Sequence, residues 1–112
     1  MDCLFCKIIE GVIPSNKVYE DEWCLAFHDI NPQTPVHVLV IPKTHIASAD
    51  EVSAENSEYI SKVFEAIPKV ARLAGLTNGY RIISNCGEDA CQSVKHIHFH
   101  IMGGRRLPEN MG

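Results

Sequence analysis

The segment 96–101 reads HIHFHI, and it is the part of the chain best suited to carry chemistry. In a β-strand, residues two apart share a face and lie about 6.5–7 Å from each other. The apolar residues of the segment are therefore expected in the core, with the imidazoles of His96, His98 and His100 on the opposite surface. Three interpretations follow: a half-solvated strand, a metal site, or catalysis by a nucleophilic histidine.

Polar residues elsewhere in the chain help to choose among these interpretations. Asn85, Gln92 and Ser93 come shortly before the histidines and supply amides and a hydroxyl, neutral groups that suit phosphate oxygens or a leaving group. His37 has apolar flanks, which also fits a core histidine, and Asp29 could simply cap the loop that follows it. Together with three aligned imidazoles, these residues predict an anion site that holds its own nucleophile.

Hydrophobic periodicity and chain-breaking residues predict the elements that position these side chains. We expect a short helix over residues 4–10, capped by Asp2, and a long helix that begins after Ser53 and stops at Gly75. Pro68 lies inside the long helix, so a kink or break is expected there. The residues expected on its buried face are Ile60, Val63, Phe64, Ile67, Val70, Ala71 and Ala74.

Five short strands complete the predicted topology. Their ranges are Lys17–Glu20, Cys24–His28, His37–Ile41, Tyr80–Ser84 and Lys95–Met102. The run at 37–41 is almost wholly apolar, which is typical of a strand buried on both faces. Because only one long helix crosses between strands, the fold class is predicted to be α+β rather than a wound parallel sheet.

Composition limits the class of protein. The chain has 112 residues, of which 46% are hydrophobic and 21% charged, so one globular domain over residues 1–112 is expected. No apolar run is long enough to span a membrane, and the N-terminus does not resemble a signal peptide. A net charge of −4 argues against non-specific nucleic-acid binding. An odd number of cysteines, five, favours free thiols or metal ligands, and a cytoplasmic location is expected.

The N-terminal pair Cys3 and Cys6 has the spacing of half a zinc site. A short helix with two buried thiols would give the same pattern. The spacing alone therefore leaves both interpretations open.

The segment 92–102, QSVKHIHFHIM, resembles the signature of the histidine triad (HIT) superfamily. The blocks 24–32, 37–45 and 103–105 are similar to its nucleotide-binding, HINT-like branch, so that the resemblance covers residues 3–105. It implies a HIT-like fold: a five-stranded antiparallel sheet with one short N-terminal helix and one long helix. It also implies hydrolysis of nucleoside phosphoramidates, or nucleotidyl transfer, through a covalent nucleotidyl-histidine.

The resemblance assigns catalytic roles to four residues. His98 is the implied nucleophile, and His100 together with Ser93 would contact the α-phosphate. His37 would support the nucleophile and the movement of protons, and Ser93 could pass a proton to the departing amine.

The resemblance also assigns the nucleotide-binding residues. Asp29 would hold the ribose hydroxyls, and Asn85 would contribute to nucleotide binding. The residues that match the apolar walls around a purine base are Leu4, Phe5, Ile8, Ile30 and Leu39. One departure concerns the phosphate loop, where Ala90 and Cys91 replace a stretch that often holds glycine pairs in related proteins.

Further implications concern a cofactor and partners. His45 and His96 would join Cys3 and Cys6 in a closed, structural zinc site with no catalytic role. A two-fold homodimer is expected, with purine nucleotides such as AMP or GMP conjugates as substrates. The alternatives are a dinucleoside polyphosphate hydrolase, a nucleotide-binding regulatory or scaffold protein with incidental turnover, and a metal-dependent hydrolase that uses the three imidazoles.

Overall fold

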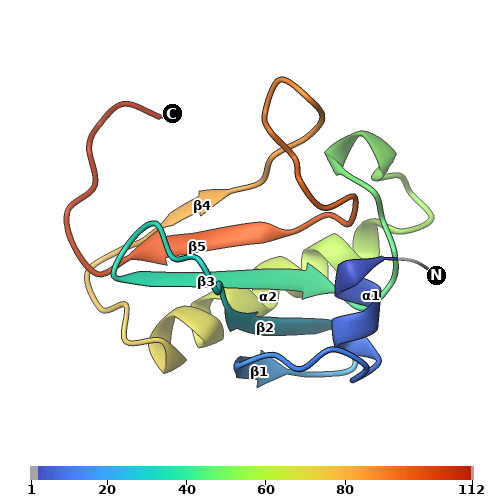
Figure 1. Ribbon diagram of the computed structural model, residues 1–112, viewed down its shortest axis with the longest axis horizontal. Coiled ribbons are helices and arrows are strands. Elements are labelled where there is room, and N and C mark those ends of the chain that lie inside the picture. Colours follow the sequence, from blue (N-terminus) through green and yellow to red (C-terminus); the bar gives the residue numbers. More distant parts are fainter. Residues whose placement is uncertain (1–2, 112) are drawn as a thin grey trace.

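The fold was obtained as a computed structural model that describes residues 3–111. Five antiparallel strands form one sheet in the order β1-β2-β3-β5-β4 (Figure 1). The strands are β1 (Lys17–Glu20), β2 (Cys24–His28), β3 (Val36–Pro42), β4 (Arg81–Ile83) and β5 (Phe99–Gly103). The helices are α1 (Leu4–Ile9) and α2 (Ser57–Leu73), with a short 3₁₀ helix at Ala49–Glu51. The predicted α+β fold with a five-stranded antiparallel sheet is confirmed.

The two helices cover opposite faces of this sheet and create two apolar clusters. Val38 and Val40 of β3 belong to the cluster beneath α2, whereas Leu39 and Ile41 belong to the cluster that includes Phe5 of α1. This alternation follows from the period of two along a strand. β3 is therefore buried on both sides, as its apolar run predicts, and the face covered by α1 is the one that carries the site.

β5 is shorter than the sequence predicts, because its pairing with β3 ends at Val40 and Phe99. Two positions further along this register Pro42 would face Ile97, and proline has no backbone N–H to donate. The N–H of Ile97 instead bonds the carbonyl of Ile46, at 2.6 Å. His96 and His98 consequently precede the strand, whereas His100 lies within it.

α2 differs in two respects from the expected long helix. It runs through Pro68 without a break, because that residue is exposed and water can satisfy the carbonyl one turn earlier. Phe64, expected in the core, is 47% exposed. Its ring still contacts Phe99, edge to face, with the centroids 5.3 Å apart.

The starts of both helices also differ from expectation. Asp2, the expected cap of the first helix, lies outside the described residues, and Cys3 occupies the N-cap position of α1. Asn56 precedes α2, and its side-chain oxygen accepts the N–H of Ser53 at 2.8 Å. This turn delays the long helix until Ser57. Within the described residues, no helix is both long enough and apolar enough to cross a membrane.

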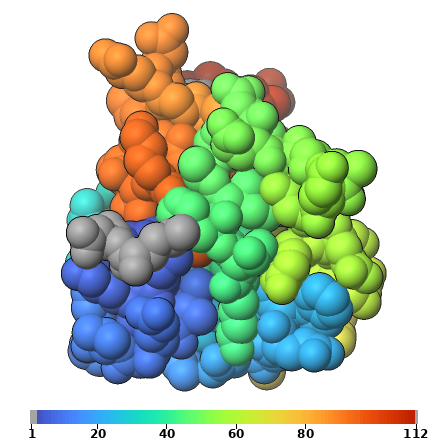
Figure 2. Space-filling view, turned by 90° about the vertical axis from the view of Figure 1, so that its right-hand side faces the viewer, coloured from blue at the N-terminus to red at the C-terminus, as the bar shows by residue number. Residues whose placement is uncertain are grey.

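Three segments far apart in the sequence meet at one end of the molecule. Figure 2 shows α1 in blue, the segment after β3 in green, and the loop before β5 in orange, projecting above them. The same loop rises above the sheet in Figure 1. His96 and His98 follow directly after this loop, so the catalytic and metal candidates lie close to this end.

Candidate functional site

The backbone fixes the protonation pattern of His98. Its Nδ1 lies 2.8 Å from the carbonyl oxygen of His96. Because a carbonyl oxygen only accepts, Nδ1 carries the hydrogen and Nε2 holds a free lone pair. The hydroxyl of Ser84 donates to the carbonyl of His98 at 2.9 Å, which anchors the same residue to the end of β4. His98 thus has the tautomer that a nucleophilic Nε2 requires.

A second chain of hydrogen bonds fixes His37 and His100. The backbone N–H of Gln33 donates to Nδ1 of His37 at 3.0 Å, so the proton of this ring is on Nε2. That Nε2–H donates to Nδ1 of His100, at 2.8 Å. His100 must then carry its own proton on Nε2, which remains available to a substrate oxygen. The sequence did not indicate the part played by Gln33, because the contact comes from its backbone.

Burial keeps this pair of imidazoles neutral. It lowers the pKa of His37, and the opposing effect of the nearby Asp29 is smaller. Burial, and after it the neighbouring His98 and His37, lowers the pKa of His100 to about 4. At neutral pH both rings are therefore uncharged, and the directions of their N–H groups are set by hydrogen bonds.

Asp29 lies beside this pair at the end of β2. Its Oδ2 is 3.4 Å from Nε2 of His37, and its Oδ1 accepts the backbone N–H of Asn31 at 2.8 Å. The Nε2 of His37 lies closer to His100 than to Asp29, so its proton is directed mainly to the neighbouring ring. The carboxylate keeps free lone pairs on both oxygens for further donors.

Asp29, His37 and His100 also place their donor atoms within 4.8 Å of one another, as a metal site would. The hydrogen bonds argue against an ion there. A metal on Nε2 of His37 would move the ring proton to Nδ1, where it would face the N–H of Gln33 as a second donor. Among the described residues the three triad histidines do not form one cluster of ligand atoms, because His96 is grouped with Cys3, Cys6 and His45 instead.

The apolar residues expected around a base divide into two groups. Phe5, Ile8 and Leu39 are buried in one cluster on the α1 face, whereas Leu4 and Ile30 are exposed. The rings of Phe5 and His98 pack edge to face, with the centroids 5.0 Å apart. The buried part of the predicted base site thus adjoins His98, the predicted nucleophile.

The loop before the triad is braced by Gln92. Its buried side-chain amide accepts the N–H of Gly87 at 3.0 Å and donates to the carbonyls of Ala47 and Val94. Gln92 therefore holds the loop in place and does not offer its amide to a phosphate. Ser93, the next residue, is exposed.

Cys91 adopts a left-handed conformation in the same loop, with a φ of 59°. Its N–H bonds the carbonyl of Glu88, and the N–H of Gln92 bonds that of Gly87, both at 3.0 Å. This pair of bonds closes a single helical turn in the way that a Schellman motif does. A left-handed position of this kind usually favours glycine, so Cys91 is an unusual residue to find there.

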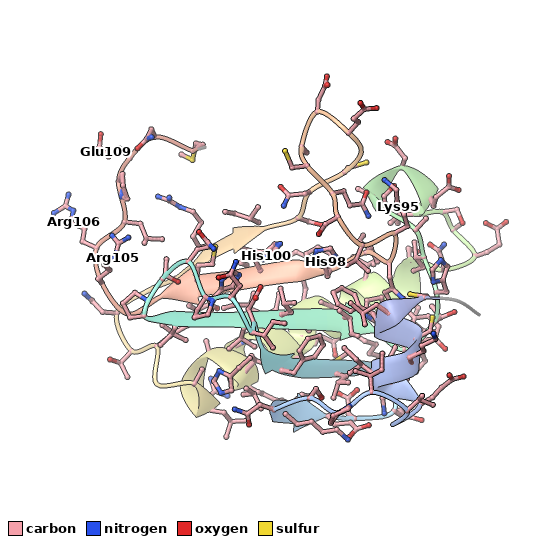
Figure 3. The ribbon with its side chains drawn as sticks, in the orientation of Figure 1. Lys95, His98, His100, Arg105, Arg106 and Glu109 are labelled. Carbon is pink, nitrogen blue, oxygen red and sulfur yellow. The ribbon has the colours of Figure 1, made fainter. Side chains whose placement is uncertain are left out.

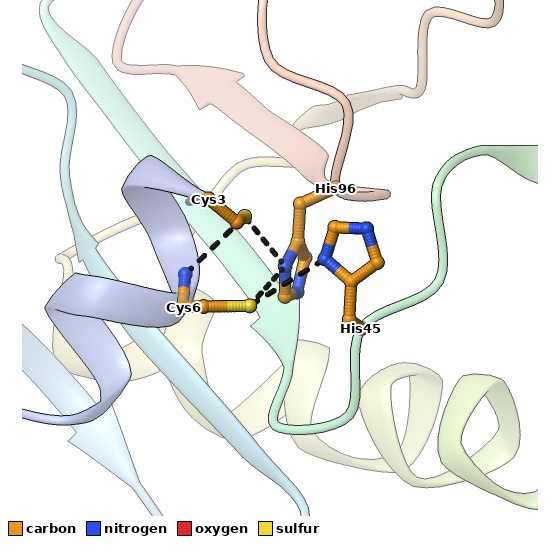
Figure 4. Close-up of side chains that lie close together, drawn as sticks. All are labelled: Cys3, Cys6, His45 and His96. Atoms are coloured by element: carbon orange, nitrogen blue, oxygen red, sulfur yellow. Dashed lines mark hydrogen bonds between the residues drawn. The ribbon is translucent and has the colours of Figure 1, made fainter. Parts of the chain in front are cut away.

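Four side chains from three segments form a separate cluster of possible metal ligands (Figure 4). Cys3 is the N-cap of α1 and Cys6 lies within that helix, whereas His45 follows β3 and His96 precedes β5. Their ligand atoms all lie within 4.8 Å of one another. The four residues predicted as zinc ligands are thus brought together.

The distances within this cluster suit a tetrahedral ion. The cysteine sulfurs lie 3.3, 3.4 and 3.6 Å from the Nδ1 atoms of His96 and His45. Bonds of about 2.3 Å to sulfur and about 2.0 Å to nitrogen give tetrahedral edges of about 3.5 Å. Nε2 of His96 donates to the carbonyl of Pro42 at 2.9 Å, so Nδ1 presents its lone pair to the sulfurs.

Burial and the neighbouring Cys3 raise the pKa of the Cys6 thiol to about 11. A cation would therefore have to displace the proton to obtain the thiolate ligand. The donor set, two sulfurs and two imidazole nitrogens, is one of the sets found in structural zinc sites.

Comparison with known proteins identifies the family. The model of the HIT domain matches residues 10–107. A 13.2 kDa HIT-like protein of Azospirillum brasilense is 54% identical over 106 residues, covering 93% of this chain and 87% of the relative. A 14 kDa zinc-binding protein of Zea mays is 49% identical over 109 residues, covering 93% of this chain and 83% of that protein.

Solved structures agree with this match. A histidine triad protein from Clostridium difficile is 46% identical, with a TM-score of 0.93, covering 99% of this chain and 97% of that one. A HIT family hydrolase from Legionella pneumophila is 44% identical, with a TM-score of 0.94, covering 99% and 100%. The triad geometry, the fold and these matches together lead to one conclusion: the chain belongs to the histidine triad (HIT) family.

Proposed function

We propose that the protein hydrolyses purine nucleoside phosphoramidates through a covalent nucleotidyl intermediate on His98. The observation that carries the proposal is the tautomer of this histidine. Its Nδ1–H is held by the carbonyl of His96, at 2.8 Å, which leaves Nε2 free to attack phosphorus. The rings of His98 and His100 lie 5.0 Å apart, so an N–H donor adjoins the nucleophile. The similar HIT family hydrolases support this reaction class.

The reaction has two balanced steps. Nε2 of His98 forms a bond to the α-phosphorus while the phosphorus–nitrogen bond of the substrate breaks, and the departing amine takes a proton from the hydroxyl of Ser93. A water molecule then returns a proton to Ser93. The oxygen of this water displaces His98 from phosphorus and so releases the nucleoside monophosphate. The Nε2–H of His100 donates to a phosphate oxygen, where negative charge grows in the transition state.

The nucleoside half of the substrate would bind on the α1 side. Phe5, Ile8 and Leu39 offer buried apolar contacts for a purine, and the exposed Leu4 and Ile30 would close over it. Asp29 would accept hydrogen bonds from the ribose hydroxyls, and Asn85 would contact the phosphate. AMP and GMP conjugates are the expected ligands. Dinucleoside polyphosphate hydrolysis is the second candidate, because the same nucleophile attacks either substrate.

The proposal also includes a structural zinc ion and a homodimer. Cys3, Cys6, His45 and His96 would hold one structural zinc ion, as their donor set and distances suit it. When bound, the ion would supply structural stability and no step of the reaction. The exposed edge strand β4 would pair with that of a second copy. A cytoplasmic location suits the free thiols of all five cysteines.

Mass measurement of the intact protein during turnover tests the covalent mechanism. With adenosine 5′-phosphoramidate as substrate, a species heavier by one adenylyl group is expected. His98→Ala should lose both the adduct and hydrolysis, while nucleotide affinity stays within about tenfold, because the nucleophile acts chiefly in the transition state. Near-native turnover by His98→Ala would refute the proposal. Turnover that is abolished by EDTA and restored by added metal would instead favour a metal-dependent hydrolase.

A further inference from the structure

A cavity of about 510 Å³ opens beside the His37–His100 pair. Residues of β4, β5 and the C-terminal segment line it, and Asn85 lies at its wall. Phe5, Ile8 and Leu39, the buried residues of the expected base site, do not line it. The cavity is therefore available to a part of the substrate other than the nucleoside.

The described residues that line this cavity include two arginines, Arg81 and Arg105, and no carboxylate. This is unexpected in a chain with fourteen acidic and ten basic residues. Glu109, in the same C-terminal segment, is exposed and does not line the cavity. Asp29 contacts His37 but is also absent from the lining. The cavity thus presents positive charge in a protein whose net charge is negative.

The two guanidinium groups keep donors free for a ligand. Arg81 uses Nη2 to bond the carbonyl of Pro108 at 2.7 Å, which ties the C-terminal segment to β4. Arg105 uses Nη1 to bond the carbonyl of Arg106 at 3.1 Å. An arginine has five N–H donors, so each keeps several for an anion. Figure 3 shows Arg105 just beyond the end of β5, whereas Arg106 points away from the sheet.

From this arrangement we infer that the cavity is a leaving-group subsite that selects substrates whose leaving group carries an anion. The inference rests on the proposed function, in which His98 attacks the α-phosphorus and the group opposite departs. The nucleoside would occupy the α1 side, the phosphate would lie at His98 and His100, and the leaving group would extend into the cavity. Its negative group, a carboxylate or a phosphate, would bind Arg81 and Arg105.

Matched substrates test this inference. Adenosine 5′-phosphoramidates of β-alanine and of β-alaninamide differ only in a carboxylate against an amide. We expect kcat/KM to be about tenfold higher for the carboxylate, the ratio that one charge-assisted hydrogen bond supplies. Diadenosine triphosphate has a nucleoside diphosphate as its leaving group. Its kcat/KM, compared with that of the β-alanine compound, shows whether the cavity prefers a phosphate or a carboxylate.

Arginine variants test whether the preference for the carboxylate arises in the cavity. Arg81→Gln and Arg105→Gln should each reduce the carboxylate-to-amide ratio to less than about threefold. Arg106→Gln removes the same charge outside the cavity and should leave the ratio unchanged. Arg81→Gln also loses the hydrogen bond to the Pro108 carbonyl. If that loss unfolds the protein, Arg105→Gln alone still tests the subsite. Equal kcat/KM values for the two substrates, or a ratio that survives both variants, would overturn the inference.

The neutral substrate separates this inference from the proposed function. Hydrolysis of the β-alaninamide compound without preference for the carboxylate would refute only the subsite. If neither compound is hydrolysed, the proposed function fails, and calorimetry with His98→Ala then compares the affinities for the two compounds. A carboxylate preference in binding would still support the subsite, and equal affinities would refute it.

Discussion

Nε2 of His37 lies 2.8 Å from Nδ1 of His100, so a side chain of β3 determines which nitrogen of a β5 side chain carries the proton. The His37 ring is itself oriented by the backbone N–H of Gln33. This relay leaves the Nε2–H of His100 available to donate to a phosphate oxygen. In the proposed reaction His37 would therefore be a positioning residue, since it would act through His100.

His37→Leu tests this relay. Without its donor, His100 can place its proton on Nδ1 and lose the Nε2–H that would bind the phosphate. We expect kcat for adenosine 5′-phosphoramidate to fall about 100-fold, as when one preorganised donor is removed, with KM within about threefold. His37→Gln retains an amide N–H and should recover part of kcat. An unchanged kcat with a raised KM would show that His37 serves only ground-state binding.

The low pKa of His100 predicts how stability depends on pH. Burial holds this pKa at about 4 in the folded protein, against about 6.5 in an unfolded chain. Between these two values the unfolded chain binds a proton that the folded chain does not. The free energy of unfolding should therefore fall as the pH drops from 6.5 towards 4, by at most about 1.4 kcal/mol per pH unit for this group.

Urea titrations at several pH values check the sign. Between pH 6.5 and pH 4, the free energy of unfolding of His100→Gln should change less with pH than that of the unaltered protein. His28→Gln replaces an exposed histidine at the end of β2 and should leave the slope as it was. Equal slopes for His100→Gln and the unaltered protein would mean that His100 titrates alike in both states.

The sequence was informative where the evidence is local. The apolar run of β3 predicts a strand buried on both faces, and Val38, Val40 and Ile41 are fully buried. The alternation of residues 96–101 correctly predicts that Ile97 and Ile101 enter the core. These features depend on periodicity, which one strand or helix shows by itself.

Features that depend on distant partners could not be predicted in the same way. The early end of β5 results from its register against Pro42, and the tautomer of His37 results from a backbone group of Gln33. The arginine-lined cavity joins Arg81 on β4 to Arg105 beyond β5, and neither residue is distinctive in the sequence. These features depend on which residues of separate segments meet in space, and the residue types of one segment do not show that.

The proposed dimer would form through the edge strand β4 and the exposed apolar side chains of α2. β4 is an edge strand, and Ile82 is 39% exposed. Ile82 pairs with Ile101, which lies on the α2 side of the sheet. Phe64 and Leu73 of α2 are 47% and 63% exposed. An edge strand beside exposed apolar side chains favours association with a second copy.

Light scattering at micromolar concentration checks the dimer. We expect twice the chain mass of 12.5 kDa. Ile82→Glu should give a monomer, because the carboxylate would be desolvated at the interface. Val12→Glu introduces the same charge at a site that is 70% exposed and distant in sequence from β4, and should remain dimeric. A stable monomer of the unaltered protein would contradict the prediction.

The zinc prediction concerns how α1 is attached to the sheet. Cys3 and Cys6 belong to the start of α1, whose Phe5 packs against His98. An ion that joins them to His45 and His96 would tie this helix to the catalytic face. Because such a site is absent from the unfolded chain, its binding free energy would add to the free energy of folding. Loss of the ion should therefore loosen the base site before it affects the chemical step.

The double variant Cys3→Ser with Cys6→Ser should bind no zinc and melt at least about 5 °C lower. Its affinity for purine nucleotides should fall more than kcat, because Phe5 and Ile8 lose their support while His98 keeps its bond to the His96 carbonyl. Cys86→Ser with Cys91→Ser removes two thiols outside the cluster and should retain the metal. Elemental analysis of protein purified without added metal decides the matter. Less than about 0.2 zinc per chain, with no rise in Tm on adding zinc, would leave Cys3 and Cys6 as ordinary packed thiols.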